Sequence, residues 1–124
     1  MEMKFYRCKH CGQIVAIVKK TAANIICCGE EMEEIIPGSV DASLEKHVPK
    51  VEVNGNLVVV RIGDIPHPMI DEHYIEWVGL KTKQGNQRKA LKPHDEPIVC
   101  FKMCDGDEVE ACYAYCNLHG LWKS

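Results

Sequence analysis

Eight cysteines in a chain of 124 residues fall into two groups near the two ends of the sequence, and this distribution constrains the fold more than any other feature. The first group is Cys8, Cys11, Cys27 and Cys28. The second group is Cys100, Cys104, Cys112 and Cys116. A unit of about 40 residues buries too little apolar surface to fold alone and usually needs a metal, disulfides or a partner chain. The sequence therefore predicts a small N-terminal unit that its own cysteines hold together.

The N-terminal cysteines have the spacing of a metal site. Cys8-x-x-Cys11 aims two sulfurs at one point, and after 15 intervening residues Cys27 and Cys28 follow directly on one another. A zinc ribbon usually ends instead in a second Cys-x-x-Cys pair. Four thiolates suit either zinc or iron, and the spacing leaves that choice open. We expect a four-thiolate metal site rather than two disulfides.

Proline and glycine divide the chain into two predicted domains. Residues 1–36 are expected to form the first, with short strands at 5–7 and 14–18 and a segment at 25–26 that leads into the second cysteine pair. Pro37-Gly38-Ser39 breaks any regular element, so we place a linker at residues 37–40. Residues 41–124 then form the second domain.

The second domain has the pattern of an all-β structure without a long helix. Asn54-Gly55 is a strong hairpin signal between expected strands at 51–53 and 57–62. Further strands are predicted at 74–80, 98–101 and 108–115, with a turn at 84–86. Alternation in the last of these places Val109 on the same side as Ala111, Tyr113 and Tyr115. Several short strands at regular spacing predict a small β-sandwich.

The charge and the apolar runs exclude two classes of partner. The formal net charge is -3, and no block of lysine and arginine forms a nucleic-acid footprint. The longest purely apolar run, Ile14 to Val18, is too short to span a membrane, and the N-terminus has no signal-peptide pattern. We therefore expect a soluble, cytoplasmic protein that binds neither nucleic acid nor membrane. Thiols stay reduced in that compartment, which favours metal binding over disulfides.

Four histidines and a cysteine of the second domain form a further candidate site. The set is His47, His67, His73, Cys116 and His119. Neutral imidazoles and one thiolate are good ligands for iron, copper or zinc. The histidines lie in loops and at the ends of expected strands, where a β-scaffold usually displays functional groups. One loop histidine alone is most often solvated, so the prediction rests on the whole set.

These segments together resemble the desulfoferrodoxins, the two-iron class of superoxide reductases. Cys8-x-x-Cys11 with Cys27-Cys28 is similar to the desulforedoxin-type domain of that family. Four more segments are similar to motifs of its catalytic domain, in the same order: Glu45-Lys46-His47-Val48-Pro49, His67-Pro68-Met69, His73-Tyr74-Ile75-Glu76-Trp77 and Cys116-Asn117-Leu118-His119-Gly120. The resemblance covers essentially the whole chain.

The resemblance implies an immunoglobulin-like β-sandwich for residues 41–124 and two irons per chain. One is an Fe(Cys)4 centre on the four N-terminal cysteines, where zinc can substitute. The other is an Fe(His)4(Cys) centre, with His47, His67, His73 and His119 around the iron and Cys116 as its axial ligand. The implied reaction is the one-electron reduction of superoxide to hydrogen peroxide, which detoxifies superoxide. The implied partners are the superoxide anion, a rubredoxin-like electron donor and a second copy of the chain in a homodimer.

Two charged residues beside His47 are implied to act at the open position of the second iron. Lys46 is expected to attract superoxide and to order a water that delivers a proton. Glu45 is expected to become a sixth ligand once peroxide has left. Spacing alone would favour an exposed, solvated ion pair here. Two other functions stay open, namely an iron electron-transfer protein without substrate binding and a structural zinc protein with an interaction role.

Three cysteines lie outside the implied ligand pattern. They are Cys100, Cys104 and Cys112. We interpret them as small, buried apolar residues, because a cysteine without a metal or a disulfide usually packs in a core. A redox-active thiol pair near the last strands is the alternative.

Overall fold

The structure, a computed structural model, describes residues 3–124 with the exception of the side chain of Glu45. The chain divides into two compact units, Met1–Ile36 and Pro37–Ser124. Both units are built from antiparallel strands, and the one helix of the described chain, α1 (Leu44–His47), is a single turn. The expected all-β class is confirmed. No helix in the described part of the chain is long and apolar enough to cross a membrane.

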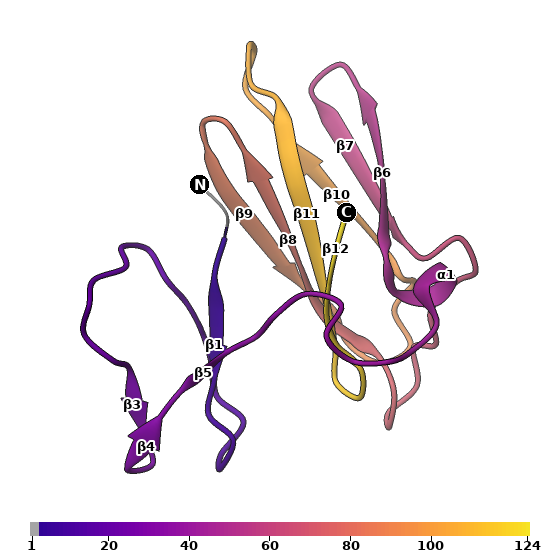
Figure 1. The fold of residues 1–124 in the computed structure, drawn as a ribbon. Helices are drawn as coiled ribbons and strands as arrows, with labels where there is room; N and C mark the ends of the chain where they lie inside the picture. Colours follow the sequence, from indigo (N-terminus) through magenta and orange to yellow (C-terminus); the bar gives the residue numbers. More distant parts are fainter. Residues whose placement is uncertain (1–2) are drawn as a thin grey trace. The chain divides into compact units, whose positions relative to one another are not determined.

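The first unit consists of short strands that position two tight turns (Figure 1). β1 (Phe5–Arg7) pairs with β2 (Ile14–Ala16) and with β5 (Glu33–Glu34), and β3 (Ile26–Cys27) pairs with β4 (Glu30–Glu31). The Cys8–Cys11 turn joins β1 to β2, and Cys28-Gly29 joins β3 to β4. Among its described residues only Phe5, Cys8 and Met32 are buried. So small a core supports the expectation that a metal stabilises this unit.

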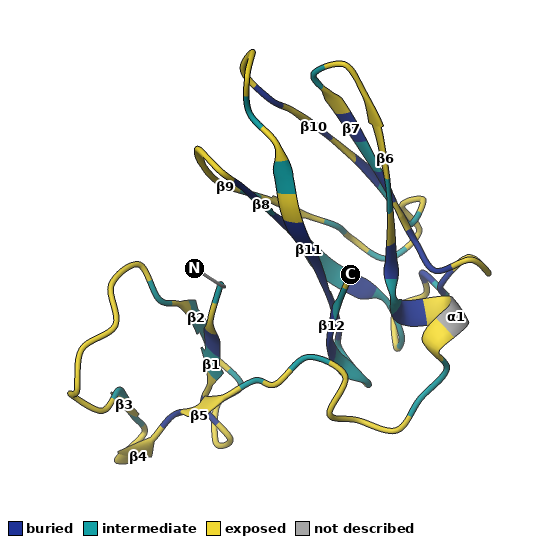
Figure 2. Ribbon diagram, turned by 45° about the horizontal axis from the view of Figure 1, so that its top comes forward, coloured by how far each residue is buried: buried dark blue, intermediate teal, exposed yellow. Residues whose placement is uncertain are grey.

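The second unit is a sandwich of two antiparallel sheets (Figure 1). One sheet has the order β10 (Ile98–Lys102), β7 (Leu57–Ile62), β6 (Pro49–Asn54). The other has the order β12 (Gly120–Lys123), β11 (Val109–Cys116), β8 (Ile75–Thr82), β9 (Gly85–Ala90). Alternate residues of both sheets form one hydrophobic core, among them Val58, Val60, Leu80, Phe101 and Ala114. Figure 2 shows these buried positions along β7, β8 and β11.

Two hairpin turns lie one or two residues away from their expected places. In the β6–β7 hairpin Asn54 pairs with Leu57, so the two-residue loop is Gly55-Asn56. Gly55 has φ +60°, which is the left-handed conformation that such loops require. In the β8–β9 hairpin Thr82 pairs with Gly85, so the turn is 83–84 rather than 84–86. The sequence marks the presence of a hairpin, whereas the register of the strands decides which residues turn.

A β-bulge changes the side on which Val109 lies. The register between β11 and β8 shifts between Val109 and Ala111, which adds one residue to β11. An extra residue reverses the alternation on one side of the bulge. Val109 therefore packs against the core that contains Cys112 and Ala114, whereas Ala111 does not. The expected grouping of Val109 with Ala111 is wrong for this reason. The strand β12 is not predicted from the sequence.

The three additional cysteines do not share one environment. Cys112 is fully buried in the core, as expected. Cys100 and Cys104 are exposed, so the interpretation of both as buried residues is wrong. Cys100 lies between the core residues Val99 and Phe101, and alternation along β10 therefore turns its side chain outward. Cys104 lies beyond the end of β10, and neither cysteine forms a disulfide in the structure.

Candidate metal centres

The first candidate centre is formed by the four N-terminal cysteines. Their sulfur atoms all lie within 4.8 Å of one another, and Cys11 Sγ lies 3.7 Å from Cys27 Sγ. Four sulfurs at about 2.3 Å from one metal in a tetrahedron would be about 3.8 Å apart. The adjacent pair is accommodated by left-handed backbone at Cys28, where φ is +53°. Residues with a Cβ seldom adopt this conformation, so folding brings Cys28 into the cluster against its local preference.

Hydrogen bonds in this cluster favour one thiolate over the others. The backbone N–H of Cys11 donates to Cys8 Sγ at 3.5 Å, and this lowers the pKa of Cys8 to about 6. The side-chain hydrogen bond with Cys11 raises the pKa of Cys27 to about 12. Without a metal, Cys8 therefore ionises more readily than Cys27 or Cys28. A bound cation removes this difference, because it deprotonates the thiols that coordinate it.

The second candidate centre is a closed ring of four imidazoles. Each pair of neighbouring rings meets edge to face, at 4.7 Å for His47–His67, 4.7 Å for His67–His73, 5.0 Å for His73–His119 and 4.9 Å for His47–His119. The diagonal pair His47–His73 is wider, at 6.3 Å. Sides of 4.7 to 5.0 Å with a diagonal of 6.3 Å have nearly the proportions of a square, and we call the arrangement the square of histidines. These histidines come from four different segments of the chain, so only the fold brings them together.

Nitrogen atoms with free lone pairs face the middle of this ring. His47 Nδ1 lies 2.6 Å from the Ser43 carbonyl oxygen, and His67 Nδ1 lies 2.7 Å from the Pro68 carbonyl oxygen. A carbonyl oxygen only accepts, so each Nδ1 carries the proton and each Nε2 keeps its lone pair. The Nε2 atoms of His67 and His73 are buried without a hydrogen-bond partner among the described residues. Buried polar atoms are seldom left unpaired, and a metal would satisfy them.

His119 and Cys116 complete the donor set. His119 Nδ1 lies 3.1 Å from His47 Nε2 and 3.9 Å from Cys116 Sγ. Two nitrogens bound at right angles to one metal at about 2.1 Å would be about 3.0 Å apart. Cys116 is fully buried and belongs to the hydrophobic core, so its sulfur approaches the ring from the core side. The donors fit a soft or borderline metal with five protein ligands, of which three histidines use Nε2 and His119 uses Nδ1.

Burial favours the neutral form of three of these histidines, His47, His67 and His73, and the neutral form is the one that binds metals. Burial lowers the pKa of His67 to about 4 and also lowers the pKa of His47 and His73. The positive charge of Lys46 contributes in the same direction at His47 and His73. Burial also raises the pKa of Cys116. The cysteine is therefore a thiol while the site holds no metal. A cation that binds beside it releases the proton and makes it a thiolate.

The two charged residues at α1 are described to different extents. Lys46 is exposed, at the end of the single helical turn that also presents His47. The side chain of Glu45 lies outside the described residues.

The remaining loop histidine, His94, pairs with Asp71 at 3.2 Å and does not belong to the ring. His10 lies 3.0 Å from Glu30 beside the first centre.

The sequence does not predict the groups that contact and orient the candidate histidine ligands. The carbonyl groups of Ser43 and Pro68 carry no side-chain signal, so no pattern reveals them. Trp122 stacks on His47 with ring centroids 4.8 Å apart. Trp122 lies three residues after His119, but this spacing indicates a contact with the site only when β12 is known. The pairing of β12 with β11 places Trp122 opposite the core residue Ala114.

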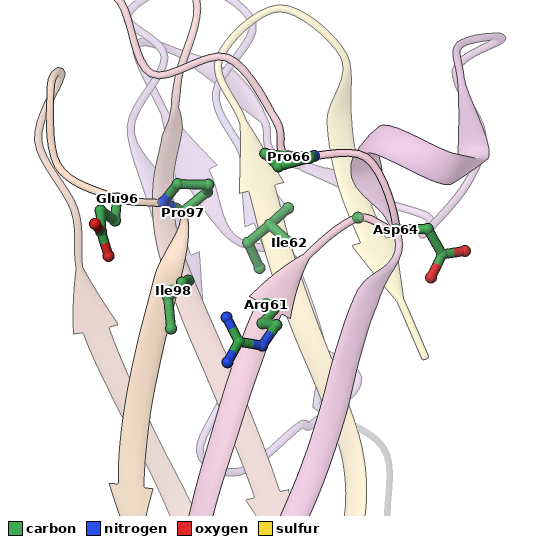
Figure 3. Close-up of a pocket in the computed structure, with 8 residues that line it drawn as sticks. Arg61, Ile62, Asp64, Pro66, Glu96, Pro97 and Ile98 are labelled. Carbon is green, nitrogen blue, oxygen red and sulfur yellow. The ribbon is translucent and has the colours of Figure 1, made fainter.

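A pocket of about 330 Å³ lies beside the segment that carries His67 (Figure 3). Its apolar walls come from Ile62, Pro66, Pro97 and Ile98, and charged side chains that include Arg61 also line it. None of the lining residues is a histidine or a cysteine. The pocket is therefore separate from the metal donors, although Pro66 directly precedes His67.

Comparisons with known proteins agree on one family. The family model for desulfoferrodoxin matches residues 39–124, and the model for the desulfoferrodoxin N-terminal domain matches residues 1–35. A desulfoferrodoxin homolog of Archaeoglobus fulgidus is 43% identical over 122 residues, which cover 98% of this chain and 96% of that protein. The desulfoferrodoxin of Nitratidesulfovibrio vulgaris is 38% identical over 123 residues, which cover 99% of this chain and 96% of that protein.

Solved structures show the same relationship. The crystal structure of the superoxide reductase from Treponema pallidum matches with a TM-score of 0.85 and 38% identity, and the match covers 100% of this chain and 99% of that one. A one-iron superoxide reductase from Giardia intestinalis matches 64% of this chain and 95% of its own, with a TM-score of 0.55 and 37% identity. Both donor sets implied by the resemblance, four cysteines in one and four histidines with a cysteine in the other, are present in the structure. The chain belongs to the desulfoferrodoxin family.

Proposed function

We propose that this protein is a superoxide reductase that converts superoxide to hydrogen peroxide at an iron held by the second donor set. The observation that carries the proposal is the closed square of four imidazoles with the buried thiol of Cys116 on its core side. We assign His47, His67, His73, His119 and Cys116 as ligands of this iron. We assign Cys8, Cys11, Cys27 and Cys28 as ligands of the other iron. We also assign the domains as residues 1–36 and 41–124, with the linker at 37–40.

Five protein ligands would leave one coordination position of the iron for a small anion. When bound, ferrous iron supplies the single electron that, together with two protons, reduces one superoxide to one hydrogen peroxide. Cys116 would hold the iron from the core side, and its thiolate would supply electron density to it, as a thiolate does in thiolate-ligated haem. The four histidines would hold the same iron through their imidazole nitrogens.

We propose that Lys46 guides superoxide to this position. Its ammonium group is exposed, and its charge acts on both His47 and His73, which are diagonal corners of the square. A positive charge at the mouth of a site raises the local concentration of an anionic substrate. The ammonium group also orders a water from which a proton is delivered. Glu45, the neighbour of Lys46 in α1, is proposed as the group that occupies the sixth position after peroxide has left.

The partners and location implied by the family remain proposals. A rubredoxin-like protein is proposed as the electron donor, and a second copy of this chain is proposed to complete a homodimer. The four-cysteine iron is proposed to stabilise the first unit, which has little core of its own, and to be available as an electron relay. We also propose a cytoplasmic location, where thiols stay reduced and available to a metal.

The stoichiometry of product formation tests the proposed reaction. Protein prepared without oxygen is first analysed for metal and then mixed in its reduced form with superoxide. A reductase yields one peroxide per superoxide, oxidises one iron and releases no oxygen. A yield of one peroxide per two superoxides, with oxygen released, indicates dismutation and overturns the proposal. Zinc in both sites overturns it as well.

A second measurement separates the enzyme from a simple electron carrier. Azide or cyanide is added to the iron-loaded protein, and its absorption spectrum is recorded. A small anion shifts the spectrum if the sixth position accepts ligands, as the proposal requires. An unchanged spectrum, together with rapid electron exchange, indicates a carrier that binds no substrate.

A further inference from the structure

The turn between β11 and β12 presents two of the five ligands of the second centre. Cys116 pairs with Gly120, so residues 117–119 form a three-residue hairpin loop. Gly120 has φ +79°, the left-handed conformation that closes loops of this length. This turn fixes His119 relative to Cys116. It does not by itself fix either of them relative to the histidines that come from other segments.

Asn117 connects this turn to the segment of His73. Its side-chain carbonyl oxygen accepts a hydrogen bond from the Tyr74 N–H at 3.0 Å, and its side-chain amide donates to the Glu72 carbonyl oxygen at 3.0 Å. These two groups belong to the peptide bonds immediately before and after His73. The backbone N–H of Asn117 also donates to the Tyr74 carbonyl oxygen at 3.2 Å. One side chain therefore holds the backbone of His73 from both sides.

Trp122 connects the same turn to His47. Its indole ring stacks on the His47 imidazole, with centroids 4.8 Å apart and an angle of 26° between the planes. Its indole N–H donates to the His119 carbonyl oxygen at 3.1 Å. The tryptophan is 2% exposed, so neither contact competes with water. One side chain therefore holds one ligand through its ring and another through its backbone.

We propose that Asn117 and Trp122 are positioning residues that assemble the square of histidines before the metal binds. Asn117 sets His73 relative to Cys116, and Trp122 sets His47 relative to His119. The two links start from one turn and reach opposite corners of the square. Neither side chain is a ligand, and neither has a role in the proposed reaction described above. The inference concerns the site of the proposed function, but its test is metal retention, which does not require superoxide.

Residues that support metal ligands typically change metal affinity by about 10- to 100-fold when they are replaced. Asn117→Ala removes both side-chain hydrogen bonds, and Trp122→Leu removes both the stacked ring and the donor. Two milder variants separate these contributions. Asn117→Asp keeps the acceptor for Tyr74 but sets a carboxylate oxygen against the Glu72 carbonyl. Trp122→Phe keeps a stacked ring and loses only the N–H.

Two matched controls lie in the same unit. Asn56→Ala removes a side-chain hydrogen bond to Asp105 at the tip of the β6–β7 hairpin, at the end of those strands away from His47 and His67. Trp77→Phe alters a tryptophan that stacks on Tyr115 rather than on a ligand. The four-cysteine iron of the same molecule is an internal control, because a different set of residues in the other unit would hold it.

The experiment measures the rate at which each iron passes to a chelator in anaerobic, reduced protein. The thiolate-to-iron charge-transfer band of the second centre is recorded separately, after the iron-loaded protein has been oxidised. We expect Asn117→Ala and Trp122→Leu to lose the second iron at least about 10-fold faster than the controls and to shift this band. The rate at which Trp122→Phe loses the second iron should lie between the rates of Trp122→Leu and the wild type. The release rate of the four-cysteine iron and the urea midpoint of unfolding should stay close to those of the controls.

The inference is overturned if Asn117→Ala and Trp122→Leu hold the second iron as firmly as Asn56→Ala and Trp77→Phe, with an unchanged band. Should either severe variant fail to fold, Asn117→Asp and Trp122→Phe answer the same question, and wild-type release rates from both would overturn the inference. If the wild type shows no superoxide reduction but the release rates differ as expected, the proposed function fails and this inference stands.

Discussion

Acid should destabilise the metal-free second unit, because burial favours the neutral form of His47, His67 and His73. Burial lowers the pKa of His67 to about 4 from 6.5, and it also lowers the pKa of His47 and His73. When the metal is absent, these rings can take up protons. In the folded state protonation would place positive charges together in a buried ring, whereas the unfolded chain protonates its histidines freely.

The sign and size of the effect follow from His67. Between about pH 6.5 and pH 4 the unfolded chain binds a proton at His67 that the folded chain does not, so stability falls as the pH falls through this window. The difference between 6.5 and about 4 corresponds to about 3.4 kcal/mol. Entry of water into the metal-free ring reduces this, and we expect about 2 kcal/mol between pH 7 and pH 4.5. Above about pH 6.5 the contribution of His67 does not change with pH.

Urea unfolding of metal-free, reduced protein at pH 7 and pH 4.5 measures this difference. Both tryptophans of the chain, Trp77 and Trp122, lie in the second unit, so their fluorescence reports on that unit alone. His67→Gln should show a smaller loss of stability on acidification, while His94→Gln, outside the square, should behave as the wild type. If His67→Gln and the wild type lose stability equally, protonation of His67 is not the cause and the reasoning is refuted.

Three further changes test the two centres. Lys46→Ala should slow the reaction with superoxide about 10-fold at low ionic strength without loss of iron, and added salt should narrow the difference. Pulse radiolysis measures this, with Lys50→Ala as the control, and equal rates would exclude a steering role. Cys116→Ser should abolish the thiolate-to-iron charge-transfer band while Cys100→Ser keeps it, and a persistent band would mean that another cysteine is the ligand. Removing metal from the four-cysteine site should strip amide protection from residues 3–36 in hydrogen exchange but leave the second unit protected, so equal protection before and after would argue against a stabilising role for that metal.

Local patterns account for the parts of the fold that the sequence predicts well. The four N-terminal cysteines lie within 21 residues, so a single turn and one return of the chain suffice to bring them together. Short apolar runs rich in β-branched residues likewise identify β7 and β10, because each strand needs only its own pattern to be recognised. The Asn54-Gly55 signal finds a hairpin for the same reason, although the pairing of Asn54 with Leu57 moves the turn by one residue.

Features that depend on contacts between distant segments are harder to predict from the sequence. β12 was missed because its four residues form a strand only against β11. The predicted face of Val109 was wrong because a bulge interrupts the alternation of β11. No residue type in β11 indicates that a bulge is present. The exposure of Cys100 depends on the register of β10, whereas a cysteine by itself suggests burial. In each case the partner strand decides the outcome.

The two centres therefore relate to folding in opposite ways. In the first unit only Phe5, Cys8 and Met32 are buried among the described residues, and Cys8 is itself a proposed ligand, so we expect a metal to stabilise the fold. In the second unit the proposed ligands span residues 47–119, and closing loops of that length costs conformational entropy. A hydrophobic core of two sheets offsets that cost without a metal. The square can then be present before iron arrives, and holding a fixed geometry through a change of oxidation state becomes a property of the protein rather than of the metal.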